Sequence, residues 1–210
     1  MNVCSRSSII ADHLFFVVLF PFLVTGFIII FMILFLTKGS SQLFFIQERM
    51  GRYGIPFRIY KFQTLENGSD INRFTHFLRQ TGLDELPQIA NIIRGEMLLF
   101  GPRPKLWREI PYDYVADYQK YILIRHPGLL SLCMSNSGPG QSLYRSPSEM
   151  KKDVIRILLY ERYEQIHWSP KLMFTIIYCC FRKILKNGAS ILAGNLIGTN
   201  ADCVLNVSAI

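Results

Sequence analysis

The amino-acid sequence predicts an α+β, mainly helical fold made of an N-terminal membrane segment and a small domain that contains a β-hairpin. An uncharged apolar run extends from His13 to Thr37 and is long enough to enter a membrane. Residues 43–65 hold two stretches of strand-like composition on either side of Gly51 and Gly54, which is typical of a hairpin. Beyond residue 72, apolar residues recur at helical spacing in several segments.

The composition indicates a membrane-associated protein with an anionic partner. Half of the 210 residues are hydrophobic, and the formal net charge is +8. Most of the apolar excess lies in the first forty residues, so a membrane segment is joined to a more ordinary domain. A basic balance suits phosphorylated ligands or an anionic lipid surface. Nucleic acid is disfavoured as a partner, because no run of Lys and Arg exceeds two residues.

The five cysteines predict neither a disulfide framework nor a zinc site. Their number is odd, their spacing is irregular, and no CxxC pair occurs. This pattern fits a reducing compartment.

Two membrane geometries fit the apolar run. The run holds about 25 residues, so a straight helix over it would be roughly 40 Å long, whereas the hydrocarbon core is about 30 Å thick. It forms either a kinked spanning helix with its N-terminus outside or a re-entrant hairpin, and Pro21 would kink both. The residues alone favour the spanning helix, because kinked spanning helices are common. Basic residues are sparse before the run and richer after it, so both geometries place the rest of the chain on the cytoplasmic face.

The chain divides into an anchor over residues 1–40, a folded domain over 41–190 and a weakly ordered tail over 191–210. After the hairpin we expect a polar loop at 66–72, a short helix at 73–80 and a helix at 84–94 that ends at Gly95. A buried strand at 97–100 and a rigid turn at 101–104 follow, and then a tyrosine-rich helix at 111–124 and a loop region at 127–148. The last elements are an amphipathic helix at 149–166, with Leu159 and Tyr163 facing inward, and an apolar segment at 171–186 suited to the membrane interface.

The densest cluster of chemically active residue types begins at Arg79 and includes Asp84 and Glu85. Asp84 lies where a helix is expected to begin, so it is either a simple N-cap or an ionised nucleophile. Two adjacent carboxylates can have different roles in catalysis: one attacks as a nucleophile, and the other binds Mg²⁺ or transfers a proton. Magnesium prefers one or two carboxylates together with phosphate oxygens.

Two arginines near this pair are suited to bidentate phosphate contacts. Arg79 precedes the carboxylates, and Arg103 follows them between two prolines. The prolines fix the backbone, so the guanidinium of Arg103 has little entropy left to lose on binding. An ordinary surface turn is the competing interpretation of residues 101–104.

From about residue 43 to 128 the chain resembles the bacterial sugar transferase family, whose members are also called monotopic phosphoglycosyl transferases. A weaker similarity continues through Tyr160 to Thr175. The matching pieces, in order, are Phe45-x-Gln47-x-Arg49-x-Gly51-x-x-Gly54-x-x-Phe57, Lys61-Phe62-x-Thr64, Arg79, Leu83-Asp84-Glu85-Leu86-Pro87-Gln88, Asn91, Gly95-Glu96-Met97, Gly101-Pro102-Arg103-Pro104 and Pro127-Gly128.

This resemblance implies that the protein moves a sugar 1-phosphate from a UDP-sugar to polyprenyl (undecaprenyl) phosphate and releases UMP. Such a step begins the synthesis of exopolysaccharide, capsule, O-antigen or another glycan. Asp84 would form a phosphosugar-aspartate, and Glu85 would bind Mg²⁺ and assist the second attack. The residues that would bind substrate and its phosphates are Arg79, Arg103, Lys61, Arg49, Gln47, Pro127 and Gly128.

The resemblance also changes the expected membrane geometry. The family's apolar segment is a re-entrant helix broken at a proline, which here would be Pro21. The domain would then sit on the inner leaflet of the bacterial cytoplasmic membrane. A homo-oligomer and partners in polysaccharide assembly both stay open, as do the identity of the sugar and the pathway.

Departures from the family pattern leave one alternative function open. Phe20 stands where many relatives have Ser before the proline, and Pro170 stands where they have Asp. The stretch 129–136 differs most, and it lies where the family shapes its nucleotide-sugar site. The alternative is a catalytically weak relative that serves as a membrane scaffold in polysaccharide assembly.

Overall fold

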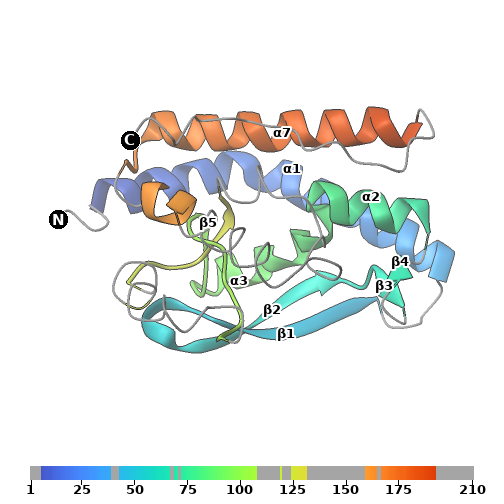
Figure 1. The fold of residues 1–210 in the computed structure, drawn as a ribbon, viewed down its shortest axis with the longest axis horizontal. Helices are drawn as coiled ribbons and strands as arrows, with labels where there is room; N and C mark the ends of the chain where they lie inside the picture. Colours follow the sequence, from blue (N-terminus) through green and yellow to red (C-terminus); the bar gives the residue numbers. More distant parts are fainter. Residues whose placement is uncertain are drawn as a thin grey trace.

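The computed structural model describes residues 6–38, 43–66, 69–70, 72–107, 119, 124–131, 159–164 and 167–192. Helices α1 (Arg6–Lys38) and α7 (Pro170–Leu192) lie side by side on one side of the molecule, and the β-hairpin lies on the opposite side (Figure 1). The short elements that carry the candidate site lie between these two layers. The mainly helical prediction and the predicted hairpin are confirmed in these ranges.

Helix α1 is uninterrupted over 33 residues and contains Pro21. Proline removes one helical N–H, and the Thr25 hydroxyl donates to the Pro21 carbonyl at 2.8 Å. The helix continues through this residue, and the membrane bend there stays a prediction. Within the described residues, one helical stretch, Ile9–Thr37, is long and apolar enough to cross a membrane.

The hairpin joins β1 (Phe44–Met50) and β2 (Pro56–Phe62) in an antiparallel register that pairs Gln47 with Ile59. The turn is a single 3₁₀ turn, η1 (Arg52–Gly54), with positive φ at Tyr53 and Gly54. A Cβ on Gly51 would lie 2.7 Å from the Ile55 carbonyl oxygen, so a side chain would not fit there.

Helix α2 (Arg73–Thr81) begins at a capping box in which Asn72 and Thr75 bond to each other's backbone N–H. It ends at Gly82, whose φ of 79° suits glycine. The chain continues as the 3₁₀ helix η2 (Leu83–Gln88) and then α3 (Ile89–Ile93), so the helix predicted at 84–94 is largely confirmed.

Asp84 is not the N-cap, which is a correction to the prediction. Gly82 occupies that position, and Asp84 lies one residue inside η2. The first part of the segment, which contains Pro87, is 3₁₀ rather than α.

The predicted buried strand is β5 (Leu98–Phe100), and its partner is a short parallel strand, β6 (Gly128–Leu130). The interpretation of residues 127–148 as loop is therefore wrong at Gly128–Leu130. Pro127-Gly128 looks like a turn in the sequence, whereas here the glycine allows two backbones to meet. A second small pairing joins β3 (Leu65–Glu66) to β4 (Ser69–Asp70) within the expected polar loop.

Two apolar clusters hold these elements together along the length of α1. One contains Phe100, Met173 and Ile176, against which Phe15 and Leu23 of α1 pack. The other contains Phe62 and Leu86, with Ile30 and Leu34 of α1 buried among them. Both halves of the helix therefore contact the same folded domain.

The remaining predictions are covered only in part by the described residues. Helix α7 is longer than the segment expected at 171–186. Residues 159–164 are helical, but Leu159 is exposed while Glu161 and Glu164 are buried, so the face expected to point inward is wrong at Leu159. Most of 111–124, 132–158 and the tail beyond Leu192 lie outside the described residues. Cys179 is disulfide-bonded and Cys180 is a free thiol, so the expected absence of disulfides is wrong at Cys179.

Candidate active site

The two adjacent carboxylates of η2 lie in different surroundings. Glu85 is buried, whereas Asp84 is only partly buried and reaches the surface. Because a 3₁₀ helix has three residues per turn, the adjacent side chains of Asp84 and Glu85 point in different directions. Only Asp84 is therefore open to a ligand while its neighbour is enclosed by protein.

Glu85 is held by two cations that come from distant parts of the chain. Lys61 of β2 places its Nζ 2.6 Å from Glu85 Oε1. Arg103 donates through Nη2 to the same oxygen, and its Nη1 lies 3.4 Å from Oε2. Burial alone would raise the pKa of Glu85, but the charges and hydrogen bonds of Arg103 and Lys61 lower it to about 2. Glu85 is therefore ionised at neutral pH.

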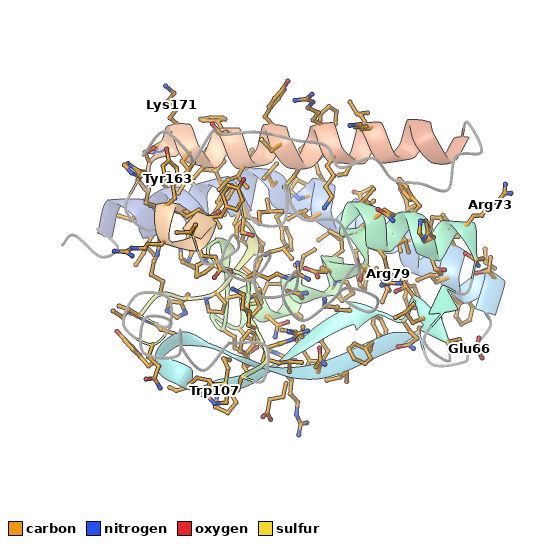
Figure 2. The ribbon with its side chains drawn as sticks, viewed as in Figure 1. Glu66, Arg73, Arg79, Trp107, Tyr163 and Lys171 are labelled. Atoms are coloured by element: carbon orange, nitrogen blue, oxygen red, sulfur yellow. The ribbon has the colours of Figure 1, made fainter. Side chains whose placement is uncertain are left out.

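Asp84 has the opposite electrostatic character. Burial and the neighbouring charge of Glu85 raise its pKa to about 6, and this rise is opposed by Lys61, Arg103 and Arg79. A carboxyl group with this pKa is mostly ionised at pH 7 yet more basic than a free aspartate, which improves it as a nucleophile. Figure 2 shows Arg79 at the hairpin side of α2.

The structure thus brings five predicted residues together in one place: Asp84, Glu85, Lys61, Arg79 and Arg103. They come from β2, the last turn of α2, η2 and the turn after β5. Three cations around two carboxylates leave a net positive charge, which suits a diphosphate.

Arg49 and Gln47 lie on β1, the strand paired with the one that carries Lys61. They bond to each other, with Arg49 Nη2 2.6 Å from Gln47 Oε1. Gln47 and Arg49 are two residues apart on β1, and the register of the hairpin places both on the same face as Lys61. Arg49 pairs with Phe57, four residues from Lys61, which corresponds to about 13 Å along the strand at about 3.3 Å per residue. Their role in binding substrate stays a prediction.

Pro127 and Gly128 act here through their backbone. The Pro127 carbonyl accepts from the Leu98 N–H at 2.9 Å, and the Gly128 N–H donates to the Pro102 carbonyl at 3.0 Å. A Cβ on Gly128 would lie 2.0 Å from the Gly101 nitrogen. These two residues hold the turn that carries Arg103, and their predicted contact with substrate is untested.

Sequence reasoning missed two buried acidic residues that support this turn. Glu161 is fully buried and receives Lys105 Nζ at 2.7 Å, and the backbone N–H of Arg103 also bonds to it. Asp12 is buried under β5. The position of Asp12 in the sequence could have indicated this role. An acidic residue directly before an apolar run is energetically unfavourable in a membrane or a core unless another group pairs with it. Glu161 carries no such signal, since acids on amphipathic helices are usually solvated.

The two adjacent carboxylates have the chemistry to share a magnesium ion with a substrate, but in this structure both oxygens of Glu85 contact Arg103 or Lys61. No cluster of three or more His, Cys, Asp or Glu suited to a metal occurs in the part of the chain that the structure describes. A pair of carboxylates matches the protein share of a Mg²⁺ site whose other ligands are phosphate oxygens and water. An all-protein metal cage is not what these residues form.

Comparison with known proteins places the chain among sugar transferases. The family model described as "Bacterial sugar transferase" matches residues 5–187. The chain is 33% identical over 133 residues to the UDP-galactose-lipid carrier transferase of Erwinia amylovora, covering 50% of this chain and 27% of that protein. It is 32% identical over 162 residues to the uncharacterized sugar transferase EpsL of Bacillus subtilis, covering 70% and 72%.

A third relative is the UDP-glucose:undecaprenyl-phosphate glucose-1-phosphate transferase of Klebsiella pneumoniae, which is 30% identical over 158 residues. The match covers 68% of this chain and 33% of that protein. The chain therefore spans about a third or less of the length of two of these relatives and most of the third. Since the family model covers most of the chain and the matched part contains the whole carboxylate cluster, the protein belongs to the bacterial sugar transferase family.

Proposed function

We propose that this protein transfers a sugar 1-phosphate from a UDP-sugar to polyprenyl phosphate, with Asp84 as the covalent nucleophile. The observation that carries the proposal is the division between the two carboxylates. Lys61 and Arg103 neutralise the buried Glu85, while the more basic Asp84 reaches the surface beside the same cations. Two of the relatives are named as transferases to a lipid carrier or to undecaprenyl phosphate.

The proposed reaction has two displacements at one phosphorus atom. An Asp84 carboxylate oxygen attacks the sugar-bearing phosphorus of the UDP-sugar, and the bond to the bridging oxygen breaks, so UMP leaves with the electron pair. A phosphate oxygen of polyprenyl phosphate then attacks the phosphosugar-aspartate. The aspartyl oxygen leaves, which regenerates Asp84 and gives polyprenyl-diphospho-sugar. Splitting the transfer in this way replaces one difficult step by two easier ones.

The three cations have two tasks in this scheme, and Arg103 takes part in both. Lys61 and Arg103 keep Glu85 ionised. Arg79 and Arg103 are suited to hold phosphate oxygens, because a guanidinium presents paired donors to them. Mg²⁺ held by Glu85 and the substrate phosphates would require Glu85 to exchange Lys61 or Arg103 for the ion, and the ion would neutralise charge on the diphosphate during the transfer.

The membrane location of the reaction follows from the same proposal. Polyprenyl phosphate presents its head group at the surface of a leaflet, so the site must lie at that depth. The outward face of α1 is apolar, with Val17, Val18 and Phe22 each about two-thirds or more exposed. We infer that this face contacts lipid and that the domain rests on the inner leaflet of the cytoplasmic membrane.

The test is release of UMP by the full chain in lipid nanodiscs. With a UDP-sugar alone, we expect UMP in an amount equal to the enzyme and a mass increase of one sugar phosphate on the peptide that contains Asp84. Addition of undecaprenyl phosphate should make release catalytic, and chelation of Mg²⁺ should stop it.

The matched control is Asp84→Asn, which keeps the shape of the side chain and removes the nucleophile. It should lose at least about a thousandfold in rate, because a covalent nucleophile typically contributes several orders of magnitude. A variant that keeps more than about a tenth of the wild-type rate would contradict the role of Asp84. Absence of UMP release from every UDP-sugar tried would instead favour the membrane scaffold.

A further inference from the structure

We propose that Asp12, in the first part of the apolar helix, is a positioning residue for the turn that carries Arg103. Its carboxylate links α1 to β5 by hydrogen bonds. Because β5 leads directly into that turn, the position of the apolar helix affects the geometry of the reactive site. This inference rests on the proposed function for its kinetic test, and it has a structural test that does not.

Asp12 is enclosed by the domain rather than by lipid or water. Its exposed fraction is 1%, although its neighbours His13 and Leu14 on the same helix are exposed. Oδ1 accepts the N–H of Phe100 at 2.8 Å, and Oδ2 accepts the N–H of Leu99 at 3.1 Å. A buried carboxylate is costly unless hydrogen bonds satisfy it, so the helix gains from Asp12 only when β5 is in place.

Strand β5 passes directly into the turn Gly101–Pro104. The N–H groups at the start of β5 and directly after it donate to the segment around β6. The Leu98 N–H donates to the Pro127 carbonyl, and the Gly101 N–H donates to the Leu130 carbonyl. Asp12 supplies acceptors for the two residues between those points. The strand is thereby fixed from both sides over its whole length.

Little freedom separates this strand from Arg103. Gly101 and Pro102 are buried, and Gly101 touches the backbone of His126 and Gly128 closely enough to exclude a Cβ. Prolines on both sides of Arg103 fix their own φ angles. A displacement of β5 is therefore passed on to the Arg103 guanidinium, which contacts Glu85.

Apolar contacts hold the helix near the strand independently of Asp12. The ring of Phe15 meets that of Phe100 edge to face at 5.6 Å, and it meets Phe174 of α7 at 5.0 Å. Since these contacts supply packing without direction, the two hydrogen bonds of Asp12 fix where β5 sits relative to the helix. Asp12 can therefore be changed while the apolar contacts of Phe15 are kept, and this makes its role testable.

The kinetic test uses Asp12→Asn in the full chain in nanodiscs. The amide keeps one acceptor and turns a donor toward the other strand N–H. We expect kcat/KM for UMP release to fall by about 10- to 100-fold, because a displacement of about 1 Å at a site can cost this much. The control is His13→Asn, which changes an exposed side chain of the same helical turn and should stay within about twofold of wild type.

A double-mutant cycle decides whether the loss acts through Arg103. If it does, Asp12→Asn combined with Arg103→Lys should be no more than about threefold slower than Arg103→Lys alone. Phe15→Leu weakens the packing without altering the carboxylate, and its effect should add to that of Arg103→Lys. Full additivity of Asp12→Asn would overturn the proposal.

The structural test is hydrogen exchange of the peptide spanning 98–104. Asp12→Asn should speed its exchange by about tenfold or more while the hairpin 44–62 is unchanged, and His13→Asn should leave both as in wild type. Unchanged exchange at 98–104 overturns the inference. If wild type releases no UMP but this segment loosens, the proposed function fails and the role of Asp12 stands. Should Asp12→Asn not fold, Asp12→Glu keeps the charge on a longer stem, and wild-type exchange in that variant overturns the inference.

Discussion

At the scale of single residues, the site depends on which carboxylate is neutralised. Glu85 has Lys61 and Arg103 against its oxygens, so its charge is retained despite burial. Asp84 has its cations further away, and burial together with the charge of Glu85 raises its pKa. Two residues that look equivalent in the sequence thus receive different properties from the elements that surround them.

The contact of Arg103 with both Glu85 oxygens predicts that lysine cannot replace it. Arg103→Lys keeps the charge but loses the planar fork. We expect kcat/KM for the UDP-sugar to fall by about 10- to 100-fold, since a charged hydrogen bond is worth about 1.5–3 kcal/mol. The control is Arg94→Lys, because Arg94 is exposed and bonds to Tyr60. An unchanged kcat/KM for Arg103→Lys would show that Arg103 is only a turn residue.

The buried pair of Lys105 and Glu161 predicts a large loss of stability when one partner is removed. Lys105→Met leaves the fully buried Glu161 without its counter-charge. We expect the free energy of unfolding to drop by about 3–5 kcal/mol, measured by urea denaturation. Replacing Glu161 by leucine in the same variant should restore much of this loss. The exposed Lys171 (Figure 2), changed to methionine, should alter stability by less than about 0.5 kcal/mol.

At the scale of elements, one close backbone crossing fixes the turn that carries Arg103. Strands β5 and β6 are only three residues long, and each is short for a strand that stands alone. Their stability comes from burial, because Leu99 and Phe100 are fully enclosed. Gly128 lets the strands meet directly beside Gly101.

This crossing predicts that alanine is not tolerated at residue 128. A Cβ there would lie 2.0 Å from the Gly101 nitrogen and 2.5 Å from its Cα, and both are backbone atoms that cannot move aside cheaply. We expect Gly128→Ala to lower the free energy of unfolding by at least about 1–3 kcal/mol, as forced overpacking does. Gly188→Ala is the matched control, because its Cβ would meet only the Phe77 ring at 3.7 Å. In helix α7 it should stabilise by about 0.5–1 kcal/mol, and equal effects of the two variants would contradict the argument.

At the scale of the whole molecule, α1 is part of the core as well as the candidate membrane segment. Its first half packs beside Phe100 and its second half beside Phe62 and Leu86. Figure 1 shows the N-terminal part of the helix beside α7 and its C-terminal part beside α2. A helix docked at both ends on one domain does not leave that domain to cross a bilayer at a right angle.

This arrangement predicts that both ends of α1 lie on the cytoplasmic side. After the native cysteines are replaced, a cysteine at Ser7 and one at Ser40 should each react with a membrane-impermeant maleimide only in opened cells. The reason is that the helix is held against the domain that we propose rests on the inner leaflet, with Pro21 near the middle of the apolar run. Labelling of the Ser7 probe in intact spheroplasts would show a spanning helix and contradict this topology.

The sequence by itself determined the elements whose signals are local. The alternation around Gly51 and Gly54 predicted the hairpin, and the spacing of apolar residues predicted the helix at 73–80, which the structure shows as α2. The apolar run gave α1. Turn chemistry and hydrophobic period depend on neighbours in the chain, so they can be read without knowing the fold. The motif around Asp84 gave the family and its candidate residues in the same way.

Only the tertiary structure decided which of those residues meet. Glu85 takes its cations from positions 18 and 24 residues away, and β5 takes Asp12 from 87 and 88 residues away. Gly128–Leu130 became a strand because Leu98–Phe100 pairs with it, and Glu161 became a buried counter-ion because Lys105 reaches it. Such pairings depend on how apolar faces pack over long separations. The local patterns of charge and hydropathy carry no record of that packing.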